Sequence, residues 1–430
     1  MDEFSSIATS AAVTAVLPWR DQRRGKLGFS RTSLIETALI AAPDRADNAV
    51  FGRPLLERLM INCERAGIKR FVIAAPRERY SDLARAMGRF KNLDTVAMVE
   101  SFGEILNQRN AQELGIDPSS PCVSFSGNLV FAKSQLARIL NAHASNPDSV
   151  HRAVSTDHDR GGEIATGSIG EILKRGGIST SVPASASSLL PFALNGRPED
   201  REEAELRLAK SIREESAHKD APMARWVDRR ISWRISYWLA SHTRATPNMV
   251  TVANTIFGLA TAWMFSVPNY WMRLFAAIFF LISITIDGVD GELARLKMVE
   301  SDFGGTLDVI TDNVVHSAVF IGLLVGCYRV EHSRAYLYLI PILLGGFAMC
   351  AYATWRAFKI KGEKAAEWLD KVDRWSGRDF AYLLVMLALI NRLEYFAWGT
   401  AFGTYVFALV LIWITSRTES SMKPESLQAK

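Results

Sequence analysis

Cysteine is scarce in this 430-residue sequence, and none of the cysteines pairs in a CxxC motif. The four are Cys63, Cys122, Cys327 and Cys350. This wide spacing argues against both a disulfide framework and a cysteine-ligated zinc site. The N-terminus, MDEF, also lacks the positive segment of a signal peptide. We therefore expect the first half of the chain to stay in the cytoplasm.

Long apolar runs are missing from residues 1 to about 230 but dominate residues 248–416. A membrane helix needs about 20 mostly apolar residues. Six stretches qualify, at 248–267, 271–290, 307–328, 335–356, 379–395 and 398–416. The net charge of +5 suits an anionic membrane surface. That number fits nucleic acid equally well, but the apolar half excludes nucleic acid as the expected partner.

The positive charges predict which side of the membrane the loops face. Residues 356–378, between the fourth and fifth expected spans, hold seven lysines and arginines, and positive loops stay cytoplasmic. Before the first span, Trp226, Ile231, Ile235 and Trp238 recur at helical spacing among arginines. This pattern predicts an amphipathic helix on the cytoplasmic leaflet, although a soluble helix packed on the N-terminal half would show it too.

Four aspartates interrupt this apolar region. Asp287 and Asp290 are three residues apart, and Asp308 and Asp312 are four apart, so each pair shares one helix face. A tight turn between the two helices would gather the four carboxylates at one place. Such a cluster needs divalent cations to offset its repulsion, and oxygen ligands favour Mg²⁺ or Mn²⁺. Two adjacent ions are a recurring arrangement for displacement at phosphorus.

The spacing of this segment matches a known pattern. It reads Asp-x-x-Asp-Gly-x-x-Ala-Arg, then eight residues, then Gly-x-x-x-Asp-x-x-x-Asp. This resembles the full signature of the CDP-alcohol phosphotransferases, and the resemblance covers residues 220 to 416. The family moves a substituted phosphate from a CDP-linked donor to an acceptor hydroxyl and releases CMP. The acceptor is an alcohol or a phosphorylated polyol.

The resemblance assigns roles residue by residue. It implies that the four aspartates hold two divalent ions on the donor diphosphate and that Asp312 is the general base. The residues it places near the substrates are Gly291, Ala294, Arg295, Gly304, Asn248 and Thr251. For the last two, a helix-starting role after Pro247 is the competing interpretation. His316 either tunes the base or is a packing residue. Homodimerisation is common in the family.

Residues 34–178 alternate short apolar strands with helical segments, which predicts a mostly parallel α/β sheet. Their order resembles the Rossmann-like sugar-phosphate nucleotidyltransferases. Two features depart from an active member. The phosphate loop is replaced by PDRADNAVFGRP, with Gly52 its only glycine, and Asn128 stands where a metal-binding aspartate is expected. We therefore interpret this domain as degenerate, with a structural, regulatory or partner-binding role.

The expected organisation has five parts: an extension at 1–33, the nucleotidyltransferase-like domain at 34–178, a linker and helix at 179–219, the membrane domain at 220–416 and a disordered tail at 417–430. The expected function is that of an integral transferase of the inner membrane, with its active site on the cytoplasmic side. One alternative is a bifunctional enzyme whose first domain also makes the CDP-alcohol from CTP. Another is a non-enzymatic membrane protein that binds ions through the acidic cluster.

Overall fold

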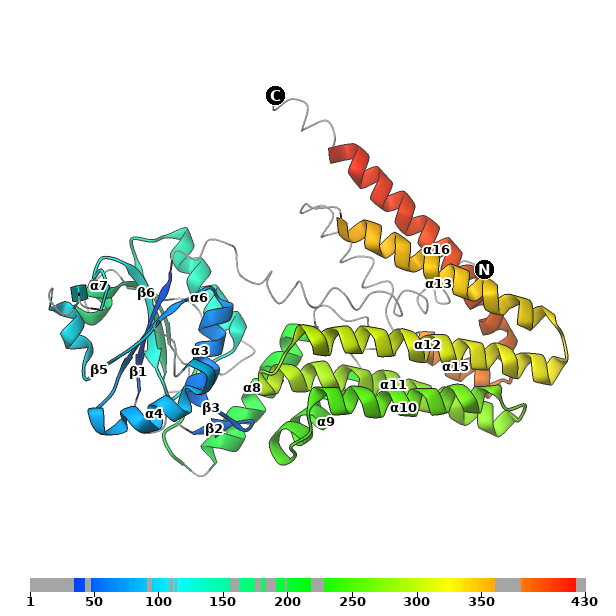
Figure 1. Ribbon diagram of the computed structural model, residues 1–430, viewed down its shortest axis with the longest axis horizontal. Helices are drawn as coiled ribbons and strands as arrows, with labels where there is room; N and C mark the ends of the chain where they lie inside the picture. The colour runs from blue at the N-terminus through cyan, green and yellow to red at the C-terminus, as the bar shows by residue number, and fades with distance from the viewer. Residues whose placement is uncertain are drawn as a thin grey trace.

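The computed structural model describes residues 35–422, apart from 43–47, 91–94, 108–110, 113, 155–161, 175–178, 182–190, 198, 218–227 and 360–379. Several predictions lie outside the described residues, namely the extension at 1–33, most of the positive loop at 356–378 and Trp226. An α/β domain lies at one end of the long axis and a helical region at the other, with α8 between them (Figure 1). The predicted pairing of an α/β domain with a helical membrane region is confirmed in these coarse terms.

The α/β domain is built on a seven-stranded sheet in the order β10-β8-β9-β6-β1-β4-β5. Strands β1 (Thr37–Ala41), β4 (Arg70–Ala74), β6 (Pro121–Ser126) and the edge strand β5 (Val96–Val99) are parallel to one another. Only β9 (Glu163–Ser168) runs antiparallel, between β6 and β8 (Val150–Val154). Helices α3 (Leu55–Arg65) and α6 (Lys133–Ser145) occupy the segments predicted to be helical.

The α/β domain continues beyond residue 178. Strand β10 (Ser179–Ser181) extends the sheet edge, and β11 (Phe192–Ala193) pairs with β7 (Leu129–Val130). Both lie in a segment rich in Ser, Pro and Ala, for which the sequence predicts only a connection. Helix α8 (Asp200–Ala217) follows, and one of its faces is buried against the α/β domain. On that face, the buried Glu205 accepts a hydrogen bond from the Phe51 amide (2.8 Å).

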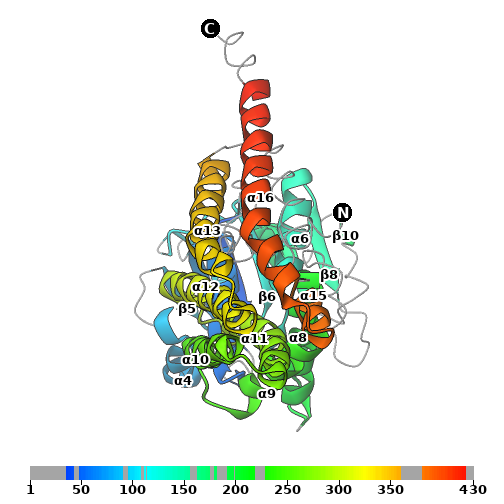
Figure 2. The same cartoon turned by 90° about the vertical axis from the view of Figure 1, so that its right-hand side faces the viewer.

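Among its described residues, the helical region contains five helices that are long and apolar enough to cross a membrane. Four are α10 (Pro247–Ser266), α11 (Tyr270–Lys297), α12 (Asp302–Glu331) and α13 (Ala335–Lys359). The fifth, α16 (Leu393–Met422), packs beside α13 (Figure 2) and continues past residue 416, where the sequence predicts disorder. Side-chain caps from Thr246, Asn269 and Ser301 start α10, α11 and α12.

Six spans are not confirmed, because the fifth predicted one is too short among the described residues. Residues expected to cross as one helix at 379–395 form the ten-residue α15 (Phe380–Leu389), followed by a turn. Asn391 adopts a left-handed backbone (φ 53°) in that turn, and Arg392 pairs with Glu394 just after it. A polar turn of this kind ends the helix, although the apolar residues around it read as one continuous run.

Helix α10 packs closely against both α11 and α12, and the three helices surround the site. A Cβ atom on Gly322 of α12 would lie 2.2 Å from the backbone oxygen of Ala262 on α10, so glycine permits this close approach. Helix α9 (Arg229–His242) lies along α11 before the first span. Its serines face α11, whereas Ile231 and Trp238 are exposed.

Candidate functional site: an aspartate cluster between two helices

The acidic cluster is positioned by the turn that joins α11 to α12. Helix α11 ends at Lys297, Met298 adopts a left-handed backbone (φ 54°), and the Ser301 hydroxyl caps α12 by accepting from the Gly304 amide. This short connection brings the last turns of α11 beside the first turns of α12. The predicted convergence of two helices at a tight turn is therefore what the structure contains.

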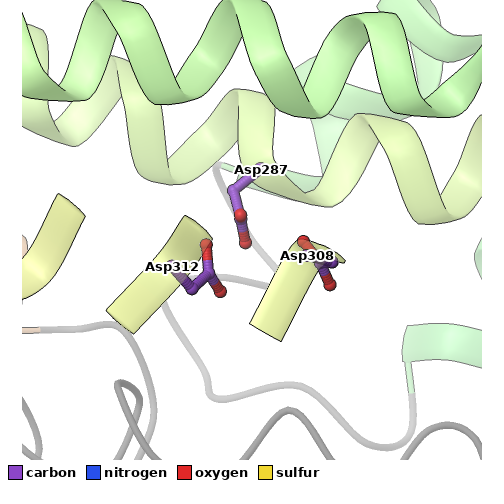
Figure 3. A group of neighbouring side chains, drawn as sticks. All are labelled: Asp287, Asp308 and Asp312. Carbon is purple, nitrogen blue, oxygen red and sulfur yellow. The ribbon is translucent and has the colours of Figure 1, made fainter. Parts of the chain in front are cut away.

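Three carboxylates meet there. Oxygen atoms of Asp287, Asp308 and Asp312 all lie within 4.8 Å of one another, and Figure 3 shows these side chains pointing into one space. Asp312 is buried, while Asp287 and Asp308 are half-buried. Carboxylate oxygens at this separation repel strongly when ionised, and a hard divalent cation between them would offset that repulsion. The donor set fits Mg²⁺ or Mn²⁺.

Asp290 lies outside this group of three. Its carboxylate accepts hydrogen bonds from the Thr251 hydroxyl of α10 and from the Gly291 amide. Asp290 is buried, so these bonds hold its carboxylate in a fixed orientation. Thr251, expected in the nucleotide pocket, thus contacts the motif directly through Asp290.

The remaining residues singled out by the sequence lie around the cluster. The guanidinium of Arg295 folds back toward Gly291, whose absent Cβ would lie 3.5 Å from Nη1. Ala294 is half-buried one residue before Arg295. On the opposite side, the side-chain oxygen of Asn248 lies 3.2 Å from where a Cβ on Gly304 would stand. The two glycines therefore leave room for a side chain to lie over each helix backbone.

A small pocket with a mixed polar and apolar lining opens beside the cluster, between α10, α11 and α12. It is lined by Asp287 and Asp312 and, farther from the turn, by Asn254, Ser283 and His316. The Ser283 hydroxyl donates to the side-chain oxygen of Asn254 at 2.9 Å. Sequence reasoning missed Asn254 and Ser283. Their signal was a polar side chain in the middle of an apolar span, which is costly unless it is paired or faces a cavity.

His316 lies as a packing residue of the bundle, and its role in tuning the base stays a prediction. Its Nδ1 lies 2.7 Å from the Asp312 carbonyl oxygen, and its ring packs against Phe280, Phe320 and Phe380. The ring is buried and also lines the pocket. It thus connects the aromatic core of the bundle to the turn that carries Asp312.

Two further polar contacts fix α9 and α15 against α11. The buried Glu292 accepts hydrogen bonds from the hydroxyls of Ser232 (2.9 Å) and Ser236 (2.6 Å) on α9. Asp228, which precedes α9, accepts from Tyr382 of α15 at 2.7 Å and from Thr285 of α11 at 3.2 Å. Sequence reasoning did not select these residues, because none of them is a fixed position of the motif: Glu292 occupies a variable position inside it, and the others lie outside it.

The α/β domain has its own candidate position at Asn128, which follows β6. Its side-chain oxygen accepts from the Ser126 hydroxyl at 2.6 Å, and its amide donates to the Leu194 carbonyl at 3.1 Å. Asn128 therefore joins β7 to the segment that contains β11. Asp44 and Asp47, the two aspartates of the segment PDRADNAVFGRP that replaces the phosphate loop, lie outside the described residues.

A helical bundle with apolar candidate spans thus carries an aspartate cluster at a helix–turn–helix. Residues 244–416 match the family model of the CDP-alcohol phosphatidyltransferases, the family whose signature the motif resembles.

The curated proteins to which the chain is similar carry one common name. The chain is 32% identical over 179 residues to a "Bifunctional IPC transferase and DIPP synthase" of Thermococcus kodakarensis, covering 40% of this chain and 38% of that protein. It is 30% identical over 159 residues to the protein of that name in Aquifex aeolicus, covering 37% of this chain and 35% of the relative. The chain thus spans under two fifths of the length of the curated relatives it matches.

Proposed function

We propose that this protein is an integral membrane enzyme that transfers a substituted phosphate from a CDP-alcohol to an acceptor hydroxyl and releases CMP. The convergence of Asp287, Asp308 and Asp312 at one point carries the proposal. The family match to residues 244–416 supports the reaction class, because the cluster lies inside the matched range.

In the proposed mechanism, Asp287, Asp290, Asp308 and Asp312 bind two divalent ions. When bound, these ions neutralise the donor diphosphate and stabilise the charge that develops during displacement. Asp290 reaches the site in the orientation set by Thr251. Asn248, beside Gly304, and Ala294 line the path of the nucleotide, and Arg295 contacts a phosphate oxygen over Gly291.

Asp312 acts as the general base. It accepts the proton of the acceptor hydroxyl as that oxygen forms a bond to the β-phosphorus. The bond between this phosphorus and the bridging oxygen of the diphosphate breaks, and CMP leaves with that oxygen. The hydrogen bond between His316 and the carbonyl oxygen of Asp312 holds this helical turn in place.

The pocket beyond Asp312 supports a hydroxylated acceptor. Asn254 and Ser283 provide an amide and a hydroxyl beside the carboxylates, and Thr255 and Thr311 add further hydroxyls. Hydroxyl and amide groups of this kind can exchange their bonds within the bundle for hydrogen bonds to an alcohol or a phosphorylated polyol, while Phe280, Ile284 and Val315 contact its carbon skeleton.

The membrane arrangement is part of the proposal. Ile231 and Trp238 on α9 are exposed beside the arginines of the same helix, which supports placing α9 on the lipid surface. The positive-loop rule places the α/β domain and the active site on the cytoplasmic side of the inner membrane. Six crossings and a homodimer remain predictions. Labelling of single cysteines introduced at residues 300 and 391 from either side of sealed vesicles tests this topology.

A CMP-release assay tests the activity. Purified protein is screened with Mg²⁺ across pairs of CDP-alcohols and acceptors, beside the Asp308→Ala variant as a control. We expect CMP from at least one pair and none from the variant. Equal CMP release from both proteins would refute the assigned site. A wild-type protein that binds Mg²⁺ but releases no CMP with any pair would favour the ion-binding alternative.

The curated relatives favour a second candidate function, because each is named as bifunctional. On this account, the α/β domain would also form the CDP-alcohol from CTP and a phospho-alcohol, releasing pyrophosphate. Two features of the α/β domain argue against it. Both polar atoms of the Asn128 side chain are hydrogen-bonded to other residues of the domain, and the segment in place of the phosphate loop has a single glycine. Incubating the full-length Asp308→Ala variant with CTP, Mg²⁺ and phospho-alcohols separates the two, since pyrophosphate release would establish the second activity.

A further inference from the structure

The carboxyl end of α11, which carries the motif, is held in part by the α/β domain. Arg58 of α3 donates through Nη1 to the Leu296 carbonyl at 2.6 Å. Arg53, just before α3, donates through Nε to the Lys297 carbonyl at 3.2 Å. A third arginine, Arg65, pairs with Glu300 in the turn after α11. Three arginines of one domain thus contact three residues of the other, Leu296, Lys297 and Glu300.

The physical reason for these contacts lies in the helix end. The last carbonyls of an α-helix have no amide partner within the helix and carry a partial negative charge. Met298 adopts a left-handed backbone, and its amide and that of Val299 turn back to the carbonyls of Ala294 and Arg295. The carbonyls of Leu296 and Lys297 instead accept hydrogen bonds from Arg58 and Arg53.

Arg58 is an unusual residue to use for such a contact. Its side chain is 3% exposed, and burial, together with the nearby Arg53, lowers the pKa of its guanidinium to about 10. Burying a cation is costly unless its donors are satisfied, so Arg58 depends on α11 as much as α11 depends on Arg58. Leu293 and Leu296 also belong to the same hydrophobic core as the residues of α3.

The end of α11 is fixed from a second direction as well. The ammonium group of Lys297 donates to the carbonyls of Thr243 (3.0 Å) and Ala245 (2.9 Å), just before α10. The segment between these contacts and the aspartates contains Gly291 and Arg295. If the last turn of α11 frayed, Arg295 would therefore be displaced before the other motif residues of this helix.

We propose that the α/β domain is a positioning element for the membrane active site, and that Arg58 is its principal positioning residue. By capping α11, Arg58 holds the turn that carries Arg295 in the orientation that binds the nucleotide part of the donor. The link to the donor rests on the proposed function, whereas the capping of α11 does not. A domain that has lost its phosphate loop would thus still be required for transfer.

Hydrogen exchange on the full-length protein in detergent tests the capping directly. Three variants are compared with the wild type: Arg58→Ala, the conservative Arg58→Lys and the control Arg77→Ala, whose arginine forms an exposed pair with Glu100. In Arg58→Ala we expect amides of residues 293–299 to exchange about tenfold faster. Amides in the middle of α12 should be unchanged. Arg58→Lys should recover part of the protection, and Arg77→Ala should match the wild type.

CMP is the probe for the link to the active site, since every CDP-alcohol donor contains it. With Mg²⁺ present, Arg58→Ala should bind CMP about fivefold more weakly or worse. Its affinity for Mn²⁺ should stay at the wild-type value, because the three clustered carboxylates lie farther from the end of α11.

Three results would overturn the proposal: unchanged exchange at 293–299 in Arg58→Ala, faster exchange throughout the chain, or faster local exchange with unchanged CMP affinity. The second result would show that Arg58 merely stabilises the fold. If the wild type itself fails to bind CMP, the proposed function fails, and the exchange experiment still decides whether the domain caps α11.

Discussion

Replacing Asp312 by asparagine should stabilise the metal-free protein, because this residue lies in a cluster of like charges. Two unit charges 4.8 Å apart, the upper limit on the separations in the cluster, repel by about 3.5 kcal/mol at an effective dielectric constant of 20. Solvent reaches Asp287 and Asp308 and screens this repulsion to roughly 1–2 kcal/mol per pair. Asp312→Asn removes two of the three pairs, so the gain is about 2–4 kcal/mol, or about 5–10 °C in melting temperature.

Thermal melting in detergent measures this gain with and without Mg²⁺. In EDTA, Asp312→Asn should melt higher than the wild type. With saturating Mg²⁺ the wild type should gain stability by linkage, while the variant should gain much less. The matched control is Asp302→Asn, at the exposed start of the same helix, which should keep the Mg²⁺ shift and gain nothing in EDTA. A variant that melts lower than the wild type in EDTA and keeps the full Mg²⁺ shift would refute the assignment of Asp312 to the cluster.

Three further predictions concern other parts of the chain. Thr251→Val removes the hydrogen bond to the motif carboxylate and should slow CMP release about tenfold or more, measured with Mn²⁺ binding as the control. Gly322→Ala should lower stability by about 1–3 kcal/mol, measured by thermal melting, because a Cβ would clash with α10. Burial and the nearby His151 ring lower the pKa of His143, so the unfolded chain binds more protons below about pH 6.5. The free energy of unfolding of the α/β domain should therefore fall as the pH drops through that value. Thiol labelling of the buried Cys63 in denaturant follows it, and His143→Gln should remove most of this dependence.

The features that could be predicted from the sequence are those written in local patterns. Apolar run length located α10 to α13, and the fixed spacing of Asp287, Asp308 and Asp312 indicated one meeting point. Alternating apolar segments indicated β1, α3 and β4. In each case the residues that decide the structure are neighbours in the chain, and each pattern has a direct physical cause.

The features that could not be predicted depend on contacts between distant segments or on single turns. The break at Asn391 rests on one left-handed residue inside an apolar run. Asp290 shares the motif with the other aspartates, yet its partner Thr251 lies on another helix. The contact between Arg58 and Leu296 joins residues 238 positions apart, and no local pattern marks either of them.

The account depends most on metal binding by the aspartate cluster, and anomalous diffraction from crystals grown with saturating Mn²⁺ tests this most directly. We predict a peak between Asp287, Asp308 and Asp312, with carboxylate oxygens about 2.0–2.2 Å from the ion. Crystals that diffract well, contain Mn²⁺ elsewhere and show no peak between these three side chains would contradict the account.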